Sequence, residues 1–118
     1  MYFRKNIQPP ETMDTSRLEM IEQMLKKDPT DDFLVYAAAL ENRKFGKVDK
    51  AIDLLTGLMK RSPDYLGTYY QLGKLLEETG REAEAIETYK AGIPIARAQN
   101  DLKASGELGE ALMFLEDE

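Results

Sequence analysis

The feature that most constrains this chain is an internal repeat at an offset of 34 residues. The segment 69–92, YYQLGKLLEETGREAEAIETYKAG, aligns with the segment 35–58, and Gly80 then falls on Gly46. Each copy has the pattern of two amphipathic helices joined by a turn. Self-similarity at a period of about 20–50 residues is typical of proteins whose small structural units stack on one another. The sequence therefore predicts a stacked repeat fold.

Hydrophobic periodicity and helix-end signals predict an all-α chain of about six helices. These are expected at about 14–27, 31–44, 48–61, 62–79, 81–98 and 101–117. Ser16 and Glu19 have the spacing of a capping box at the first start, and Gly46 suits a left-handed end of the second helix. Pro94 lies inside the fifth pattern, where it predicts either a kink or a break with a new start.

The later helix starts also carry capping signals. Ser62 followed by Pro63 is expected to open the fourth helix, and Asn100 is expected to cap the sixth. Gly106 and Gly109 within the sixth helix predict either a close helix–helix approach or fraying. The apolar stripe of this helix is expected to comprise Leu102, Leu108, Leu112 and Leu115.

Phe114 falls far from that stripe. It is interpreted either as a solitary exposed aromatic side chain or as a contact to something outside the domain.

The chain is expected to form a single helical domain, residues 14–118, after a flexible N-terminal tail, residues 1–13. The Pro9-Pro10 pair disfavours helix at the end of that tail. The full repeats are expected at about 32–65 and 66–99, followed by a capping helix at about 101–117.

Composition narrows the classes of function. The chain has 118 residues, a net charge of −6 and neither histidine nor cysteine. The commonest general base, the commonest metal ligands and the thiol nucleophile are therefore missing, and we expect no enzyme, no metal and no other cofactor. The adjacent pairs Asp31-Asp32 and Glu77-Glu78 point in different directions on a helix and are interpreted as solvated surface charge.

The acidic balance also bears on partners and location. Nucleic acid requires a basic face, so it is not an expected partner. No apolar window approaches the length that spans a bilayer, and the first residues lack the apolar core of a secretory signal. A cytoplasmic protein with no membrane partner is expected.

The aligned residues resemble the tetratricopeptide repeat, whose 34-residue unit is a helix–turn–helix. The second copy matches that pattern closely, at Tyr69, Leu72, Gly73, Leu76, Gly80, Ala85, Tyr89 and Gly92. The first copy matches loosely, at Val35, Ala38, Ala39, Asn42, Gly46, Ala51, Leu55 and Pro63. The resemblance implies a small bacterial-type stand-alone domain. Its fold would be a right-handed superhelical stack of antiparallel helix pairs, two full repeats flanked by half-repeat or capping helices.

The resemblance further implies a non-catalytic protein–protein interaction module that holds a peptide or helix of a partner in a concave groove. The first helix of each unit would line that groove. By position, the lining residues would be Phe33, Tyr36, Leu40, Arg43, Gly67, Tyr70, Lys74 and Glu77. The alternative is that Tyr36, Leu40 and Tyr70 are covered by a neighbouring helix or by the tail. Arg43 and Lys74 are expected to pair with acidic residues of a ligand.

A second hypothesis is self-assembly, as a homodimer or oligomer, through the ends of the stack. The first helix lacks a partner helix of its own and has Met13, Met20, Ile21 and Met24 near that end. Methionine adapts to irregular contacts, and a two-fold dimer is the simplest closed assembly. The alternative is that these side chains fill the core and the tail covers the end.

Overall fold

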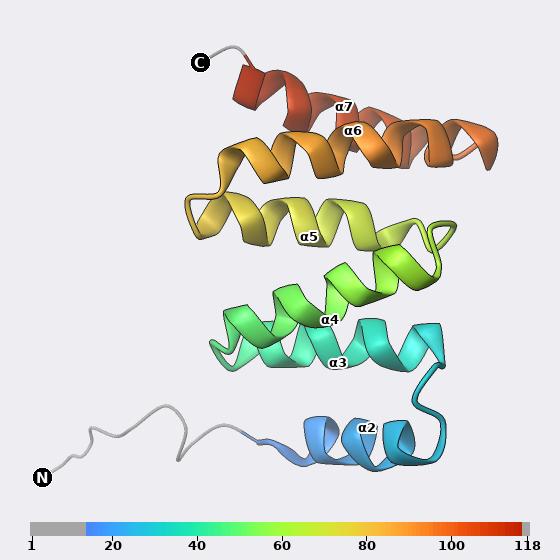
Figure 1. Cartoon of the computed structure of the whole chain (residues 1–118), viewed down its shortest axis with the longest axis vertical. Helices are drawn as coiled ribbons and strands as arrows, with labels where there is room; N and C mark the ends of the chain where they lie inside the picture. The colour runs from blue at the N-terminus through green and yellow to red at the C-terminus, as the bar shows by residue number, and fades with distance from the viewer. Residues whose placement is uncertain (1–13, 117–118) are drawn as a thin grey trace, which may run out of the picture.

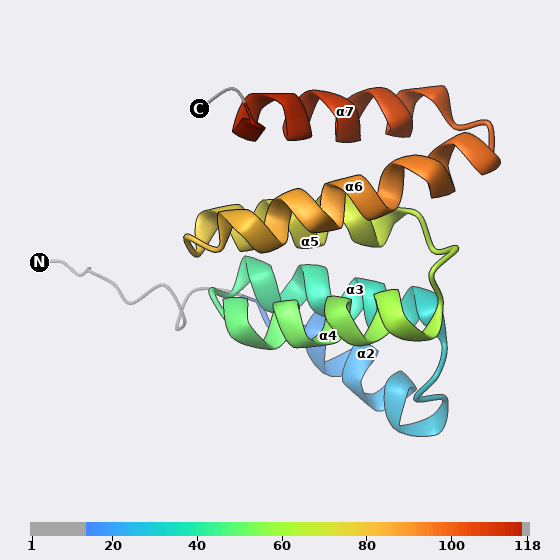
Figure 2. The ribbon, with the colours of Figure 1, turned by 45° about the horizontal axis from the view of Figure 1, so that its top comes forward.

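The computed structural model describes residues 14–116, which form six α-helices stacked along one axis (Figure 1). The helices are α2 (Ser16–Lys27), α3 (Asp32–Lys44), α4 (Val48–Arg61), α5 (Gly67–Glu78), α6 (Glu82–Ala98) and α7 (Leu102–Glu116). No strand occurs among the described residues. Figure 2 shows α3 with α4 and α5 with α6 as successive pairs. The predicted all-α repeat stack is confirmed, whereas the expected tail, residues 1–13, lies outside the described residues.

Three tight turns between helices share one geometry. The residues Gly46, Gly80 and Asn100 have φ of +80°, +77° and +57°. The amide of Gly46 donates to the Arg43 carbonyl at 2.9 Å, and the next amide, of Lys47, donates to the Asn42 carbonyl at 2.8 Å. The other two turns repeat this pair of hydrogen bonds. The left-handed end predicted at Gly46 is confirmed, because glycine adopts positive φ without a steric penalty.

Asn100 was expected to cap the start of the last helix, and this is wrong. Asn100 instead ends α6 in the left-handed conformation, which asparagine tolerates better than most residues. The cap of α7 is Asp101, whose Oδ1 accepts a hydrogen bond from the Ala104 amide at 2.9 Å. Asn100 adopts the positive φ that the turn requires, so the capping of α7 falls to the next residue, Asp101.

The predicted capping box at the first helix is also absent. Ser16 is already helical, and its amide and hydroxyl both donate to the Asp14 carboxylate. Ser62 does not open α5 either, since that helix begins at Gly67. The Ser62 hydroxyl donates to Asp32 Oδ1 at 2.8 Å, and so stabilises the loop between the two repeats.

Asp31 and Asp32 are therefore more than solvated charge. The carboxylate of Asp31 accepts from the Leu34 amide at 3.0 Å and caps α3. Asp32 pairs with Arg61 at 3.4 Å besides accepting from Ser62. Both residues stabilise local structure at the start of the first repeat.

The fifth expected helix is not broken at Pro94. Helix α6 runs from Glu82 to Ala98 with Pro94 inside it, so the expected alternative of a new start is excluded. Proline cannot donate the backbone hydrogen bond at this position, and α6 nevertheless remains one helix, packed against both α5 and α7.

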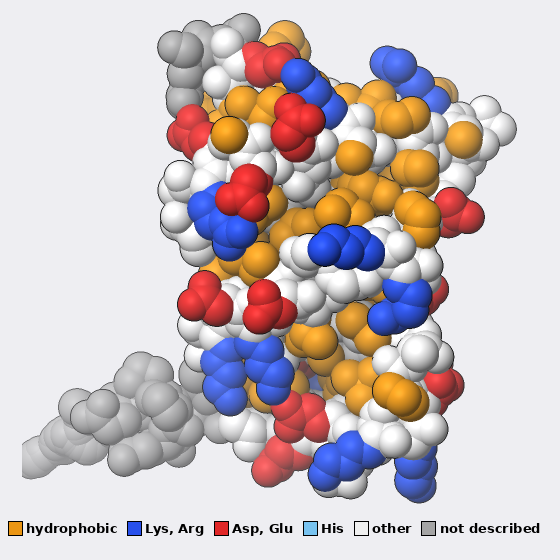
Figure 3. Space-filling model, in the orientation of Figure 1, with side chains coloured by type: hydrophobic (Ala, Val, Ile, Leu, Met, Phe, Trp, Pro, Cys, Tyr) orange, Lys and Arg blue, Asp and Glu red, His pale blue; other side chains and the backbone are white. Residues whose placement is uncertain are grey.

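Small residues set the close packing of the second repeat. A Cβ atom added at Gly73 would lie 2.1 Å from Tyr89 Cε1, and one added at Gly92 would lie 2.6 Å from Tyr69 Cβ. Tyr89 is fully buried in the main core. On the face in Figure 3, hydrophobic side chains gather over α5 and α6, with charged side chains around and among them.

At each end of the stack, some side chains are not placed as the sequence predicted. Ile21 is buried against Ala37 and Ala38 in a small separate cluster, so it is not part of an open end. At the other end, Leu102 is exposed and does not belong to the buried stripe of α7. Added Cβ atoms at Gly106 and Gly109 would meet no neighbour within 4 Å, so these glycines do not serve a close helix approach.

Candidate functional site

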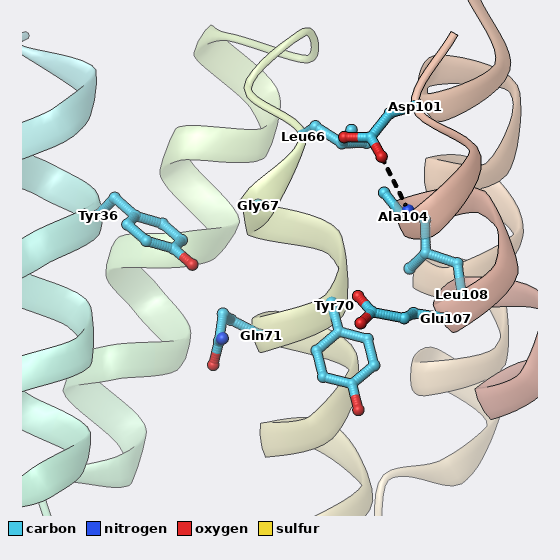
Figure 4. A pocket seen from close by; sticks show the side chains of 9 residues that line it. All are labelled: Tyr36, Leu66, Gly67, Tyr70, Gln71, Asp101, Ala104, Glu107 and Leu108. Atoms are coloured by element: carbon cyan, nitrogen blue, oxygen red, sulfur yellow. Dashed lines mark hydrogen bonds between the residues drawn. The ribbon is translucent and has the colours of Figure 1, made fainter. Parts of the chain in front are cut away.

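A groove runs between α5 and α7 and reaches α3 at one end. It comprises two hollows of about 260 and about 480 Å³. Tyr70 and Glu107 line both hollows, so the two are adjacent. The first hollow is lined by Tyr36, Leu66, Gly67, Tyr70, Gln71, Asp101, Ala104, Glu107 and Leu108 (Figure 4). The second is lined by Tyr70, Lys74, Glu107, Glu110, Ala111 and Phe114.

Tyr36 forms the end wall of the first hollow. In Figure 4 its ring points from α3 toward α5, where a Cβ atom at Gly67 would lie 3.1 Å from the tyrosine hydroxyl. The ring centroids of Tyr36 and Tyr65 are 5.3 Å apart. Burial raises the pKa of Tyr36, although a hydrogen bond with Gln71 opposes the shift. Tyr36 is thus half-buried against α5 and the repeat-connecting loop, and only part of it is open to the groove.

Tyr70 lies at the centre of the groove and is also half-buried. Its ring centroid is 6.4 Å from that of Tyr89 beneath it, and Lys74 Nζ lies 5.4 Å from its centroid. A lysine at this distance from an aromatic face gains a cation–π attraction. The hollow in front of Tyr70 therefore has an aromatic floor and a cation at its edge.

Glu77 bonds residues of its own repeat and lines neither hollow. Its carboxylate accepts a hydrogen bond from the Tyr89 hydroxyl and lies 3.6 Å from Lys74 Nζ. Burial first, and then the Glu77 carboxylate, raise the pKa of Tyr89 far above its ordinary value. The interpretation of Glu77 as solvated charge is wrong, because this carboxylate holds a buried hydroxyl.

Arg43 is engaged within the protein. Its guanidinium donates to Gln71 Oε1 at 3.0 Å and to Glu78 Oε2 at 2.5 Å. This pair connects α3 to the end of α5, so Glu78 also has a structural role. Phe33 is exposed and Leu40 half-buried, and neither lines a hollow. Of the residues expected in the groove, the structure brings together Tyr36, Gly67, Tyr70 and Lys74.

Sequence reasoning missed the whole contribution of α7. Together with its cap residue Asp101, this helix forms one wall of the groove, through Ala104, Glu107, Leu108, Glu110, Ala111 and Phe114. A signal for part of that wall is present, because the positions 67, 70, 74 and 77 become 101, 104, 108 and 111 at the same 34-residue offset. The two glycines and the exposed Phe114 favour the interpretation of this helix as a cap, which assigns its inner positions no role in the groove.

The α7 wall makes the groove acidic. In Figure 4 the Glu107 carboxylate lies on the α7 side of Tyr70. Among the ion pairs within residues 14–116, none involves Glu107 or Glu110, whereas Lys74 and Arg43 are already paired with carboxylates of α5. The unpaired charge that faces a ligand is consequently negative.

Neither a metal site nor a membrane span emerges from the described part of the chain. Residues 14–116 contain no cluster of carboxylates arranged to hold a metal ion. None of the helices in this range is long and apolar enough to cross a bilayer.

Comparison with known proteins gives consistent similarities. The profile of the tetratricopeptide repeat matches residues 43–106. The crystal structure of a tetratricopeptide repeat domain protein from Salinibacter ruber is 41% identical, with a TM-score of 0.71 over 74% of this chain and 97% of that one. No curated protein matches the sequence.

Two more distant structures share the fold alone. A protein from Bordetella parapertussis, solved in solution, is 24% identical with a TM-score of 0.75, over 89% of this chain and 90% of that one. A crystal structure of MamA is 18% identical with a TM-score of 0.59, over 85% of this chain and 67% of that one.

Proposed function

The chain belongs to the tetratricopeptide repeat family, and on that premise we propose that it is a non-catalytic module that binds a peptide or helix of a partner protein in the α5–α7 groove. The family's fold is a general protein–protein interaction module. The observation that carries the proposal is the pair of adjacent hollows around Tyr70, which are also lined by the aromatic side chains of Tyr36 and Phe114. Such a preformed surface binds with little rearrangement and so avoids part of the ordering cost.

The charges of the groove favour a ligand that combines apolar and basic side chains. Phe114 is 70% exposed at one end of the second hollow, where it offers a large apolar contact. Glu107 and Glu110 lie beside it and attract lysine or arginine. This replaces the expectation of an acidic ligand, because Arg43 and Lys74 are already paired with Glu78 and Glu77.

A quantitative pull-down from the lysate of the native host tests the groove. The variant Tyr70→Ala/Phe114→Ala is expected to lose at least tenfold in the recovery of a specific partner, since central aromatic side chains dominate interface energies. Circular dichroism checks that the variant folds as the wild type does. A basic peptide from the recovered partner is then titrated by calorimetry.

Met113→Ala is the matched control, because Met113 is 57% exposed next to Phe114 and lines neither hollow. This control should retain the partner. Full recovery with the Tyr70→Ala/Phe114→Ala variant would overturn the proposal.

The second candidate function is self-assembly through the α2 end of the stack. Met20 and Met24 are 59% and 47% exposed there. Adjacent exposed methionines suit an adaptable apolar contact between copies. Light scattering over a concentration series tests this candidate: assembly that disappears in Met20→Glu/Met24→Glu supports it, and a monomer at every concentration eliminates it.

A further inference from the structure

The helices at the two ends of the stack, α2 and α7, carry most of the exposed apolar side chains (Figure 1). Six large hydrophobic residues are exposed within residues 14–116, and five of them lie on these two helices: Met20, Met24, Leu102, Met113 and Phe114. Exposed apolar side chains that gather into patches mark interaction surfaces, whereas single ones are ordinary. The two end helices are therefore the strongest candidates for a contact with another protein chain.

On α2 the exposed methionines belong to a stripe with basic ends. Arg17, Met20, Met24 and Lys27 recur at intervals of three or four residues and fall within about 80° around the helix. All four are exposed, and the buried residues of α2 lie on another side of the helix. Arg17 pairs with Glu41 at 3.3 Å, but its side chain remains 66% exposed. Anchors at this spacing are typical of a helix that binds in a groove.

On α7 the residues that face the groove form a stripe of opposite charge. Glu107, Glu110 and Phe114 fall within about 60° around the helix, and all three are exposed and line the second hollow. No ion pair within residues 14–116 involves either glutamate. Lys74 also lines this hollow, but its ammonium group is paired with Glu77 at 3.6 Å. The α7 stripe thus complements the methionines and the basic ends of the α2 stripe.

The repeat register gives the two helices complementary places. Moved forward by 34 residues, α2 covers positions 50–61 and falls within α4, the second helix of the first repeat. Moved back by the same offset, α7 covers positions 68–82 and overlaps α5, the first helix of the second repeat. Within residues 14–116, α2 is thus a second helix without a first, and α7 is a first helix without a second.

A contact inside the second repeat indicates how such a pair meets. Met24 has the register position of Gly92, where an added Cβ atom would lie 2.6 Å from Tyr69 Cβ on the paired first helix. The counterpart of Tyr69 on α7 is Lys103. Met24 of one copy would therefore lie against Lys103 of another, whose alkyl chain is apolar.

The same pairing brings opposite charges together. The paired helices of the second repeat are antiparallel, since Gly73 meets Tyr89 and Gly92 meets Tyr69. Seven residues along each helix from the contact of positions 24 and 103, Arg17 falls opposite Glu110. An ion pair at this place fixes the register of the two helices and disfavours other partners.

We propose that the ligand of the α5–α7 groove is α2 of a second copy of this chain. Met20 falls opposite Glu107 and enters the second hollow in front of Tyr70, while Arg17 binds Glu110 and the ring of Phe114. This proposal rests on the proposed binding role of the groove and identifies its ligand. Each copy offers one α2 and one groove, so the contact joins unlike surfaces of the two copies.

The test is light scattering by the full chain with one surface altered at a time. The mass of the wild type is expected to rise with concentration. Met20→Glu/Met24→Glu alters the α2 surface, and Glu107→Lys/Glu110→Lys reverses the charge of the groove. Each variant alone should associate about tenfold more weakly than wild type, or worse. All four residues are exposed, so both variants should fold, which circular dichroism checks.

Mixing the two variants tests the pairing itself. One variant keeps an intact groove and the other an intact α2, so their mixture should form a one-to-one complex that neither forms alone. A contact between two α2 helices gives the opposite result, because Glu107→Lys/Glu110→Lys would then associate as wild type does. The matched control is Met113→Glu, which adds a charge to α7 outside both hollows and should associate as wild type does.

Three results would overturn the proposal: a wild type that is monomeric at every concentration, an undiminished association of Glu107→Lys/Glu110→Lys, and a mixture that forms no complex. Each of them leaves the groove open to another protein, which the pull-down with Tyr70→Ala/Phe114→Ala decides separately.

Discussion

The two repeats solve the same packing problem with side chains of different size. In the first repeat, Ala39 and Leu55 are both fully buried. In the second, the same positions hold Gly73 and Tyr89, and the tyrosine ring occupies the space that a Cβ atom at Gly73 would need. The smaller residue on one helix goes with the larger residue on the other, so the pair conserves volume.

A second pair of positions shows the same exchange. Val35 and Leu58 of the first repeat correspond to Tyr69 and Gly92 of the second. Gly92 admits Tyr69, whose hydroxyl also donates to the Pro63 carbonyl at 2.6 Å. Each exchange requires two coordinated substitutions, which is why the departures from the repeat pattern occur in partners.

The third difference is not compensated. Ala38 is smaller than its counterpart Leu72, and Asn42 is more polar than its counterpart Leu76. A hollow of about 210 Å³ lined by Ala38 and Asn42 lies at this place, among α2, α3 and α4. Volume-conserving changes preserve stability, whereas a change that leaves a hollow is expected to lower it. The comparison shows that Leu72 and Leu76 fill the core of the second repeat, whereas Ala38 and Asn42 leave space unfilled at the equivalent place in the first.

The largest effect is expected from Tyr89→Ala. Removing this ring should lower the free energy of unfolding by about 3–5 kcal/mol, because it leaves a large cavity beside Gly73 and Tyr70. Urea denaturation measures the change. A loss below ~1 kcal/mol would show that the second repeat does not depend on the tyrosine.

Gly73→Ala should lower the free energy of unfolding by about 1–3 kcal/mol, because the new methyl group overlaps the Tyr89 ring. Adding Tyr89→Leu reproduces the Ala39–Leu55 solution of the first repeat and should recover most of that loss. Denaturation of the two single variants and the double variant completes the thermodynamic cycle. If the two losses simply add, the residues at positions 73 and 89 are not coupled, and the explanation of the Ala39–Leu55 and Gly73–Tyr89 pairs by conserved volume is wrong.

Alkaline pH should destabilise the second repeat through Tyr89. Since the folded-state pKa of Tyr89 is raised, the native state keeps a proton that the unfolded state releases above about pH 10. Stability is fully present below that pH and falls as pH rises, by up to ~1.4 kcal/mol per pH unit from this group. Burial also raises the pKa values of Tyr36, Tyr65 and Tyr69.

Thermal melts between pH 8 and pH 11 (about the range set by the tyrosine pKa) measure this dependence. Tyr89→Phe should make it shallower, while Leu55→Val, at the equivalent place in the first repeat, should leave the slope as it is. An unchanged slope in Tyr89→Phe would contradict the assignment to Tyr89.

The smallest effect is a gain. Gly106→Ala and Gly109→Ala should each raise the free energy of unfolding by about 0.5–1 kcal/mol, because both glycines lie inside α7 with open space at the Cβ position. Gly92→Ala is the control with opposite sign, since its Cβ would meet Tyr69. Thermal denaturation distinguishes the two signs, and a loss at Gly106 would contradict the open environment of that residue.

Much of the fold was predictable from local signals. The turns at Gly46 and Gly80 and most helix bounds follow from hydrophobic periodicity and from the conformational freedom of glycine. The prediction was wrong at Ser62, whose hydroxyl bonds Asp32 while α5 begins only at Gly67. It was also wrong at Ser16 and Asn100, where residues next to each other in the chain are all suited to the capping role. Which one caps depends on φ at a single residue, and Asp101 and Asn100 differ little in this propensity.

The candidate site was predictable only in part. Tyr70 and Lys74 follow from the repeat register, because a stripe on one helix is a local property. The engagement of Glu77 with Tyr89 and of Arg43 with Glu78 joins residues on different helices, so no spacing along one helix reveals it.

By itself the sequence determined the repeat, its period and the succession of helices, since these depend on side-chain periodicity and on backbone preferences within each unit. Only the tertiary structure decided that α7 forms a wall of the groove and that a cavity remains beside Asn42. Both features depend on how closely one helix approaches another, and that distance is set by pairs of side chains far apart in the chain. One such pair is Leu108 on α7 and Gly92 on α6, where an added Cβ atom would lie 3.0 Å from Leu108 Cδ1.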